Sequence, residues 1–315
     1  MALLNTEPKV NAPFDRQQSA PLSAGAAAYS RIKGTRRRGW LVHLCLIIVC
    51  AIFLVPFLWM LSTSLKTAEH SIDYPPQWWP RPFQWSNYLT VLSSKRVHFL
   101  LWMRNTLIIE VLTVSGAVVS SSLAAYGFSR VRFRGRSALF AIMLATMMIP
   151  FPVTMVTLFG EFHWLGSHTG IQWLGTYKPL WVPAWFGSAF NIFLLRQFFL
   201  TIPEELSEAA RIDGCSELRI FLSIMLPLAR PALTVVAILT FMATWNDFLG
   251  PLIYIQRAEQ FTLALGLQNL QSQQGGTPWE QLMAASILVI LPVLLLFFLA
   301  QRTFIEGIAT TGMKG

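Results

Sequence analysis

The sequence predicts an all-α integral membrane protein. Of its 315 residues, 54% are hydrophobic and only 12% are charged, whereas roughly 25% of the residues in a typical globular protein are charged. The mean hydropathy is +0.51. The chain also contains several apolar stretches of the roughly 20 residues that a helix needs to cross a bilayer. This composition excludes a disordered chain and a disulfide framework, and it leaves a soluble enzyme too little polar surface.

Six apolar stretches are expected to form transmembrane helices. Backbone polar groups in lipid must be hydrogen-bonded internally, and none of these stretches alternates with a period of two, so we expect helices and not barrel strands. A kink is expected in the third, near Met148 and Pro150. The predicted spans are residues 40–61, 105–128, 137–159, 180–200, 228–248 and 281–300.

The positions of the basic residues predict that both termini are cytoplasmic. Lys and Arg collect on the cytoplasmic side of membrane proteins, most consistently in short loops. The turn between the second and third spans, residues 130–136, has arginine at every second position. Placing this turn in the cytoplasm places both termini there and explains the net charge of +9 as a feature of topology. We therefore expect membrane lipid around the spans and no nucleic acid as a partner.

The regions outside the spans have distinct compositions. Residues 1–39 are rich in Ala, Ser, Pro, Asn and Gln and are predicted to be a disordered cytoplasmic tail. A signal peptide is not expected, because the first apolar run begins at Trp40 and exceeds the usual length. Residues 304–315 are predicted to be a cytoplasmic C-terminal tail. The external run 74–88 is rich in Trp and Pro, and two interpretations remain open: a segment at the membrane interface or a docking surface for an external partner.

Motifs for catalysis are absent from the sequence. It has no GxxxxGK[ST] loop for phosphate, and no GxSxG or HExxH spacing. The three cysteines, Cys45, Cys50 and Cys215, are too few for a framework. We therefore expect no catalytic residues, no metal site, no cofactor bound by this chain and no enzymatic activity.

The predicted loop between the fourth and fifth spans, residues 201–227, is acidic on a side of the membrane that is otherwise basic. An acidic cluster is poorly placed beside an anionic leaflet, so a basic protein partner is the expected counterpart. Thr201 and Glu204 have the spacing of a helix capping box. Gly214 suits a left-handed turn after this helix, and a second helix is expected from Ser216. The acidic residues are Glu204, Glu205, Glu208, Asp213 and Glu217.

The same loop resembles a known family. Glu208-Ala209-Ala210, three residues, Gly214, nine residues, Ile224, one residue and Leu226-Pro227 match the EAA loop of ABC importer permeases. The runs 191–199, 245–248 and 301–315 are similar to the carbohydrate branch, specifically its MalG-like subunit. The resemblance covers residues 40–315. The chain departs from the family at Cys215, where Ala is usual, and at 309–311, where a Thr-Ala-Gly-like run is usual.

The resemblance implies a type I ABC importer permease fold, with a transmembrane permease domain over 40–303 and the EAA loop at 201–227. It implies that this loop lies in a cleft of a cytoplasmic ATPase subunit, so that closure of the ATPase dimer rotates the spans. ATP and Mg²⁺ would bind to that partner. The residues that would couple to the ATPase are Glu208, Ala209, Ala210, Asp213, Gly214, Ile224, Leu226 and Pro227.

The resemblance also implies the partners: a MalF-like second permease, a MalK-like ATPase dimer and an extracytoplasmic binding protein, in the bacterial inner membrane. The expected substrate is a sugar, a di- or oligosaccharide. Candidate residues along its pathway are Trp245, Asn246, Asp247, Met148 and Pro150, since an aromatic face and an amide suit sugar hydroxyls.

Two alternatives remain open. An ABC permease for another solute, such as a glycerol phosphate ester, would share every motif but would require basic residues facing the pathway. An ion-coupled secondary transporter would require ionisable groups at mid-membrane and inverted repeats.

Overall fold

The computed structural model describes residues 39–94, 97–272 and 276–312, with side chains described as far as residue 301. Two compact units comprise Met1–Leu58 and Trp59–Gly315. All regular secondary structure of the described residues is helical, which confirms the predicted helical class. Of the predicted tails, residues 1–38 and 313–315 lie outside the described part.

The described part of the first unit is the greater part of helix α2 (Gly39–Ser64). This helix contains the predicted span 40–61. From Trp40 to Leu54 its large apolar side chains are exposed, as expected for a helix whose solvent is lipid. The helix contains no Asp, Glu, Lys or Arg.

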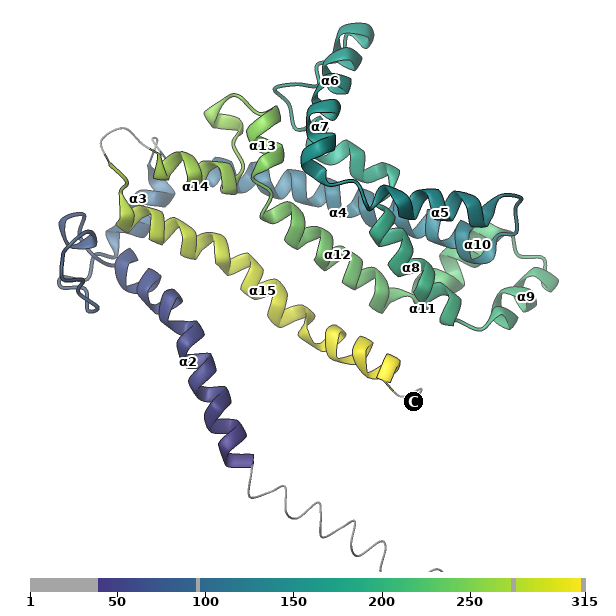
Figure 1. Cartoon of the computed structure of the whole chain (residues 1–315), viewed down its shortest axis with the longest axis horizontal. Helices are drawn as coiled ribbons and strands as arrows, with labels where there is room; N and C mark the ends of the chain where they lie inside the picture. Colours follow the sequence, from purple (N-terminus) through teal and green to yellow (C-terminus); the bar gives the residue numbers. More distant parts are fainter. Residues whose placement is uncertain (1–38, 95–96, 273–275, 313–315) are drawn as a thin grey trace, which may run out of the picture. The chain divides into compact units, whose positions relative to one another are not determined.

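The second unit is built around helix α4 (Phe99–Arg130), which contains the predicted span 105–128. Residues three and four apart along it are buried, including Trp102, Thr106 and Ile109, so one stripe of the helix faces the core. Helix α4 contacts α8 (Ala189–Thr201), α12 (Arg230–Trp245) and α14 (Leu263–Gln271). Figure 1 shows α4 extending along these shorter helices.

Two of the predicted spans are interrupted. The range 137–159 is divided between α5 (Arg136–Thr146) and α6 (Phe151–Thr169), which meet at 100°. The break falls at Met147–Pro150, as expected for a proline-bearing segment. The range 180–200 is divided among α7 (Lys178–Trp181), the 3₁₀ helix η2 (Val182–Phe186) and α8. Gly187, at φ +87°, separates η2 from α8.

The remaining predicted spans correspond to α12 and to α15 (Trp279–Gly312), which contacts α12. Within the described residues, three helices are individually long and apolar enough to cross a membrane. The number of candidate spans rises to as many as six if each pair of helices joined at a bend is counted as one span. The shorter helices are η1 (Glu69–Ser71), α3 (Ser86–Ser93), α13 (Leu249–Tyr254) and η4 (Ala258–Gln260).

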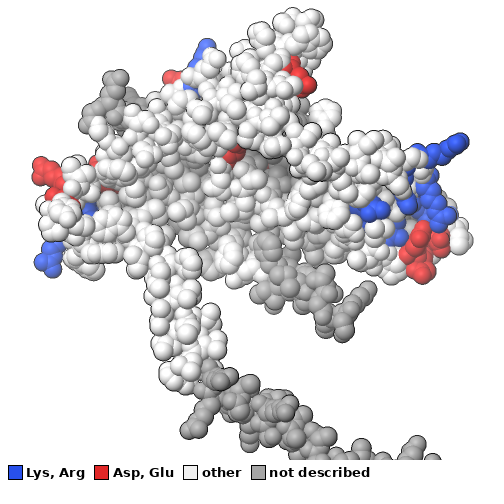
Figure 2. Space-filling view, in the orientation of Figure 1, with Lys and Arg blue, Asp and Glu red and all other residues white. Residues whose placement is uncertain are grey.

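Two main clusters of buried side chains hold the second unit together. One surrounds Trp102, Trp245 and Leu263. The other joins α4 and α8 to the segment that follows α9 (Glu204–Ile212), through Leu195, Phe199, Ile220, Phe221 and Met225. Figure 2 shows many of the visible basic and acidic residues gathered at the end that carries α9, and a mostly uncharged surface between the ends. The 201–227 loop therefore rests on apolar packing and presents a charged end.

Candidate functional site

The 201–227 loop begins with a sharp turn from α8 into α9. The axes of these helices differ by 76°, and Pro203 is the residue before the first turn of α9. The predicted capping box is wrong. Helix α8 continues to Thr201, whose hydroxyl donates to the carbonyl of Phe198 at 2.7 Å. A Thr side chain in a last helical turn bonds back to the preceding turn, so it does not cap α9.

Helix α9 has a buried and an exposed face. Ser207 and Ala210 are buried, and the Ser207 hydroxyl lies 3.9 Å from the sulfur of Met225. Glu208 and Ala209 are exposed. The two alanines of the EAA motif therefore differ in environment: Ala210 packs inside this chain, whereas Ala209 faces outward.

The turn after α9 has the conformation predicted for Gly214. Its φ is +80°, the left-handed region in which glycine meets no penalty from a Cβ. The amide of Cys215 donates to the carbonyl of Ala210 at 2.9 Å, closing the helix end as in a Schellman turn. The predicted start at Ser216 is also confirmed, because its hydroxyl accepts from the amide of Arg219 at 3.4 Å and α10 (Glu217–Ile220) follows.

The chain then returns to the bundle through an irregular helix. A π-helical turn, η3 (Phe221–Met225), leads into α11 (Leu226–Leu228), and the axis bends by 78° before α12. Ile224 and Leu226 of the motif are half-buried, while Pro227 is exposed. The motif thus contributes buried, half-buried and exposed side chains.

A hydrogen-bond network centred on Glu217 joins α9, α10 and α4. The Arg211 guanidinium donates to Glu217, with Nε 2.6 Å from Oε1, and the Tyr126 hydroxyl donates to Oε2 at 2.5 Å. These two donors, Arg211 foremost, hold the pKa of the Glu217 carboxyl below its ordinary value. Glu217 therefore remains ionised and ties the two helices of the loop to a residue of α4.

Two arginines connect α4 to α8 beneath the loop. Nη2 of buried Arg130 donates to the carbonyl of Phe199 at 2.6 Å and also to the carbonyl of Ile202. In the opposite direction, Nε of Arg196 donates to the carbonyl of Phe128 at 3.1 Å. Each arginine thereby satisfies carbonyl groups at the C-terminal end of the other helix, where the helix dipole also favours positive charge.

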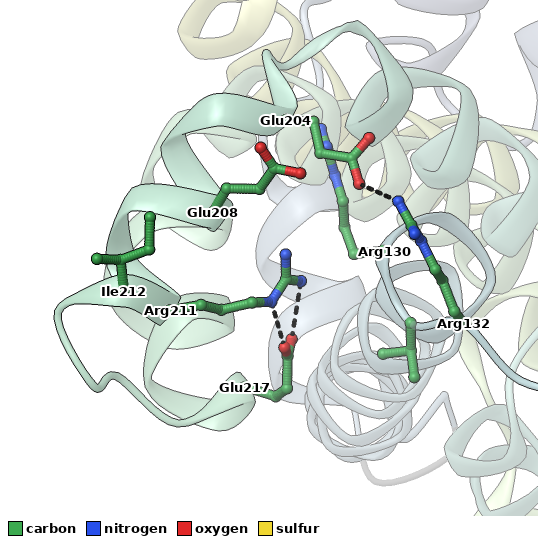
Figure 3. A pocket seen from close by; sticks show the side chains of 8 residues that line it. Arg130, Arg132, Glu204, Glu208, Arg211, Ile212 and Glu217 are labelled. Carbon is green, nitrogen blue, oxygen red and sulfur yellow. Dashed lines mark hydrogen bonds and ion pairs between the residues drawn. The ribbon is translucent and has the colours of Figure 1, made fainter.

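The concave side of the loop is an open hollow of about 530 Å³ (Figure 3). Glu204 and Arg132 face each other across its mouth at 3.6 Å, but both side chains are more than half exposed, so this pair contributes little to stability. Two of the five acidic residues predicted to face a basic partner, Glu204 and Glu217, are thus paired within the chain. The lining residues are Arg130, Val131, Arg132, Glu204, Glu208, Arg211, Ile212 and Glu217.

The exposed side chains of the loop include apolar as well as acidic residues, and one of them, Ile212, also lines the hollow. Exposed apolar patches often mark interaction sites. We refer to the following as the exposed apolar set: Leu206, Ala209, Ile212, Leu218 and Leu222.

The candidate pathway residues lie apart from this loop. Trp245 is buried; its indole stacks on Phe241 at 5.2 Å between ring centroids, and its Nε1 donates to the carbonyl of Val289 at 3.3 Å. The Asn246 amide is exposed and donates to the carbonyl of Met242. These contacts give Trp245 a packing role within this chain, and a role in the sugar pathway stays a prediction.

The other three candidates occupy chain breaks. Asp247 accepts from the amide of Gly250 at 3.1 Å. Met148 is 84% exposed and Pro150 precedes the first turn of α6, both at the break between α5 and α6. Within the described part of the chain, no group of three or more His, Cys, Asp or Glu side chains is arranged to hold a metal ion.

Arg130, Tyr126 and Arg211 are parts of the site that the sequence does not predict. Arg130 stands in the arginine-rich turn, whose positive charge is typical of a cytoplasmic loop. The one available indication was the position of Arg130 at the apolar end of a predicted span, where a cation needs acceptors.

Comparison with known proteins is consistent with this architecture. Residues 116–309 match the family described as the binding-protein-dependent transport system inner membrane component. The arabinooligosaccharides transport system permease protein AraQ of Bacillus subtilis (strain 168) is 32% identical over 273 residues, covering 84% of this chain and 92% of the relative. The trehalose/maltose transport system permease protein MalG of Thermococcus litoralis is 32% identical over 271 residues, covering 85% and 94%.

A solved structure shares the fold. One chain of a bacterial ABC transporter involved in the import of the acidic polysaccharide alginate superposes with a TM-score of 0.73 at 24% identity. The match covers 92% of this chain and 99% of the other.

Proposed function

Because this chain belongs to the family of inner membrane components of binding-protein-dependent transport systems, we propose that it is the MalG-like permease subunit of an ATP-driven sugar importer. The names of its relatives support a di- or oligosaccharide as the substrate, since one is a permease protein for arabinooligosaccharides and another for trehalose and maltose. In the proposed complex, an extracytoplasmic binding protein delivers the sugar to a pathway that this chain forms with a homologous second permease.

The proposed topology has six spans in the bacterial inner membrane, with both termini in the cytoplasm. It is supported by α2, α4 and α15, which are each long and apolar enough to cross a membrane, and by the bent pairs, which raise the count of candidate spans to as many as six. The arginines of the 130–136 turn supply the orientation. An even number of spans then returns the C-terminus to the side of the N-terminus.

The proposed coupling element is the 201–227 loop. The observation that carries this proposal is the division of α9 into an anchored face and an exposed face. Ser207 and Ala210 are buried against the chain, whereas Leu206 and Ala209 face outward. An ATPase subunit that receives the exposed apolar set would move α9, and the contacts beneath α9 would pass this movement to α4 and α8 as a rigid-body rotation.

In the proposed complex, catalysis belongs to the ATPase partner. The sequence lacks a phosphate-cradling motif, so ATP and Mg²⁺ are assigned to the ATPase subunits. We expect the purified chain alone to show no ATP hydrolysis. Hydrolysis by the isolated chain would contradict this assignment.

The test of the whole proposal is reconstitution of the complete transporter in proteoliposomes. We expect sugar uptake to require ATP and the binding protein, and the loaded binding protein to stimulate ATP hydrolysis. The screen should include maltose, trehalose and arabino-oligosaccharides, with a glycerol phosphate ester as the comparison solute. If the ester stimulated ATP hydrolysis and none of the sugars did, the sugar assignment would be replaced by the alternative of an ABC permease for another solute.

A further inference from the structure

The aromatic segment that follows α2 is fastened to the end of that helix. The Trp78 ring meets Trp59 edge to face, with 5.0 Å between centroids. The Ser62 hydroxyl donates to the carbonyl of Trp78. Nearby, the Asn87 amide donates to the carbonyls of Ser64 and Lys66 at 2.9 and 2.8 Å. These contacts join residues 78–88 to residues 59–66, so the segment has a defined place at the end of α2.

The same segment leaves its aromatic rings exposed. Trp79 and Trp85 are 64% and 65% exposed. Between them Phe83 contacts both, at 5.7 Å from the Trp79 ring and 6.4 Å from the Trp85 ring. Mutual contact keeps the three rings together, and their outer surfaces are not covered by the described residues. Arg81 is the one charged residue from Trp78 to Trp85.

The position of this segment along α2 relates it to the bilayer. The described part of helix α2 has 26 residues, and its uncharged apolar run 40–61 is roughly 33 Å long, close to a hydrocarbon core of roughly 30 Å. Trp59 lies about 7 Å before the end of the helix at the usual rise per residue. A bilayer centred on this apolar run would place its boundary with the headgroups close to Trp59, and Trp78 contacts that residue.

We propose that residues 78–85, which we call the aromatic anchor, lie in the headgroup layer of the membrane at the end of α2. Indole rings suit this layer because each has a large apolar body and one N–H donor. Arg81 suits it as well, since its apolar stem can stay beside the rings while its guanidinium reaches lipid phosphate. The Lys66 ammonium lies 4.1 Å from the centroid of the Trp59 ring, which stabilises the junction through a cation–π contact.

The anchor would give α2 a fixed depth. Because residues 78–88 are bonded to residues 59–66, a segment held in the headgroup layer also holds the end of the helix there. Contact with lipid headgroups is a role separate from the transport function proposed above. Of the two interpretations that the sequence left open for residues 74–88, it favours a segment at the membrane interface over a docking surface for a protein.

The test measures membrane depth directly. Nitroxide labels are placed at Trp79→Cys or Trp85→Cys in a Cys45→Ser, Cys50→Ser, Cys215→Ser background. The complete transporter is reconstituted in vesicles of phosphatidylethanolamine and phosphatidylglycerol without binding protein. Collision with oxygen, which concentrates in lipid, is compared with collision with a water-soluble nickel chelate. Both replaced side chains are largely exposed, so the substitutions leave no buried void.

We expect both labels to collide preferentially with oxygen, with an oxygen-to-nickel ratio several-fold above that of a control label at Glu69→Cys. Glu69 is an exposed residue of η1 in the same external region. Ratios at 79 and 85 equal to that of the control would overturn the proposal. Nickel access that disappears only when the binding protein is added would likewise overturn it and would show a protein-docking surface instead.

Discussion

Arg130 of α4 and Arg196 of α8 each donate hydrogen bonds to carbonyl groups at the C-terminal end of the other's helix. Arg130 reaches the carbonyl of Phe199 at 2.6 Å, and Arg196 reaches that of Phe128 at 3.1 Å. The exchange links the two helices directly beneath the 201–227 loop. In the proposed transporter, a displacement of the loop would therefore move α4 and α8 together.

The first prediction concerns the buried member of this exchange. Arg130→Ala removes a buried donor from two carbonyls, and we expect the free energy of unfolding to fall by about 3 kcal/mol. Arg132→Ala is the matched control. Its side chain is 84% exposed and its partner, Glu204, is 3.6 Å away, so we expect a change within about 0.5 kcal/mol. Thermal unfolding of the purified complex measures both, and equal midpoints would contradict the assigned role of Arg130.

The second prediction concerns acid stability of the loop. Hydrogen bonds from Arg211 and Tyr126 lower the pKa of Glu217 in the folded chain. A lowered folded pKa contributes stability above the carboxyl's ordinary pKa, and this contribution is lost as the pH falls through the folded value. We expect Glu217→Gln to lower the unfolding midpoint at pH 7. The difference in midpoint between the variant and the wild type should become smaller as the pH falls towards 3.

The control for this experiment is Glu205→Gln, an exposed position on α9. It removes the same charge without removing the contact between Arg211 and Glu217. A pH dependence for Glu217→Gln that matched that of Glu205→Gln would contradict the prediction.

The third prediction separates backbone conformation from space at a glycine. A Cβ added at Gly214 or at Gly127 would meet nothing within 4 Å. Gly214 has φ +80°, however, while Gly127 lies inside α4. We expect Gly214→Ala to cost about 1 kcal/mol because of the left-handed backbone. Gly127→Ala should be neutral or slightly stabilising, since alanine favours a helix. Equal losses in thermal unfolding would show that conformation is not the cause.

The fourth prediction concerns an unpartnered carboxyl. Glu110 of α4 is 3% exposed, and neither carboxylate oxygen has a hydrogen-bond partner among the described residues. Burying such a group is unfavourable, so Glu110→Met should raise the unfolding midpoint. Thr106→Val, one turn earlier, should lower it, because the Thr106 hydroxyl accepts from the amide of Leu263 at 2.9 Å. A lower midpoint for Glu110→Met would indicate a partner for the carboxyl.

Features set by local patterns were predictable from the sequence. Apolar runs predicted α2 and α4 because lipid requires long internally bonded segments. The left-handed turn at Gly214 and the helix start at Ser216 follow from the residues at those positions. Pro150 likewise marked the break between α5 and α6.

Features set by distant contacts were not predictable. The carbonyl that Arg130 satisfies lies 69 residues away, and no spacing rule connects such positions. Thr201 has the spacing of a capping residue, but α8 extends through it and its hydroxyl turns back to Phe198. Burial of Trp245 depends on Phe241 and on the carbonyl of Val289 in α15. A pattern in one segment cannot reveal which face another segment will cover.

The central claim is that the exposed face of α9 receives the ATPase, and Ala209→Trp tests it most directly. Ala209 is exposed, so a larger side chain need not disturb the fold, whereas it would prevent close approach of another subunit. The control is Ala68→Trp, the same substitution at an exposed alanine of the segment after α2. Both variants are reconstituted with all subunits, and sugar-stimulated ATP hydrolysis and uptake are measured. We predict that Ala209→Trp abolishes both with an unchanged unfolding midpoint, while Ala68→Trp retains them. Normal uptake by Ala209→Trp would contradict the account.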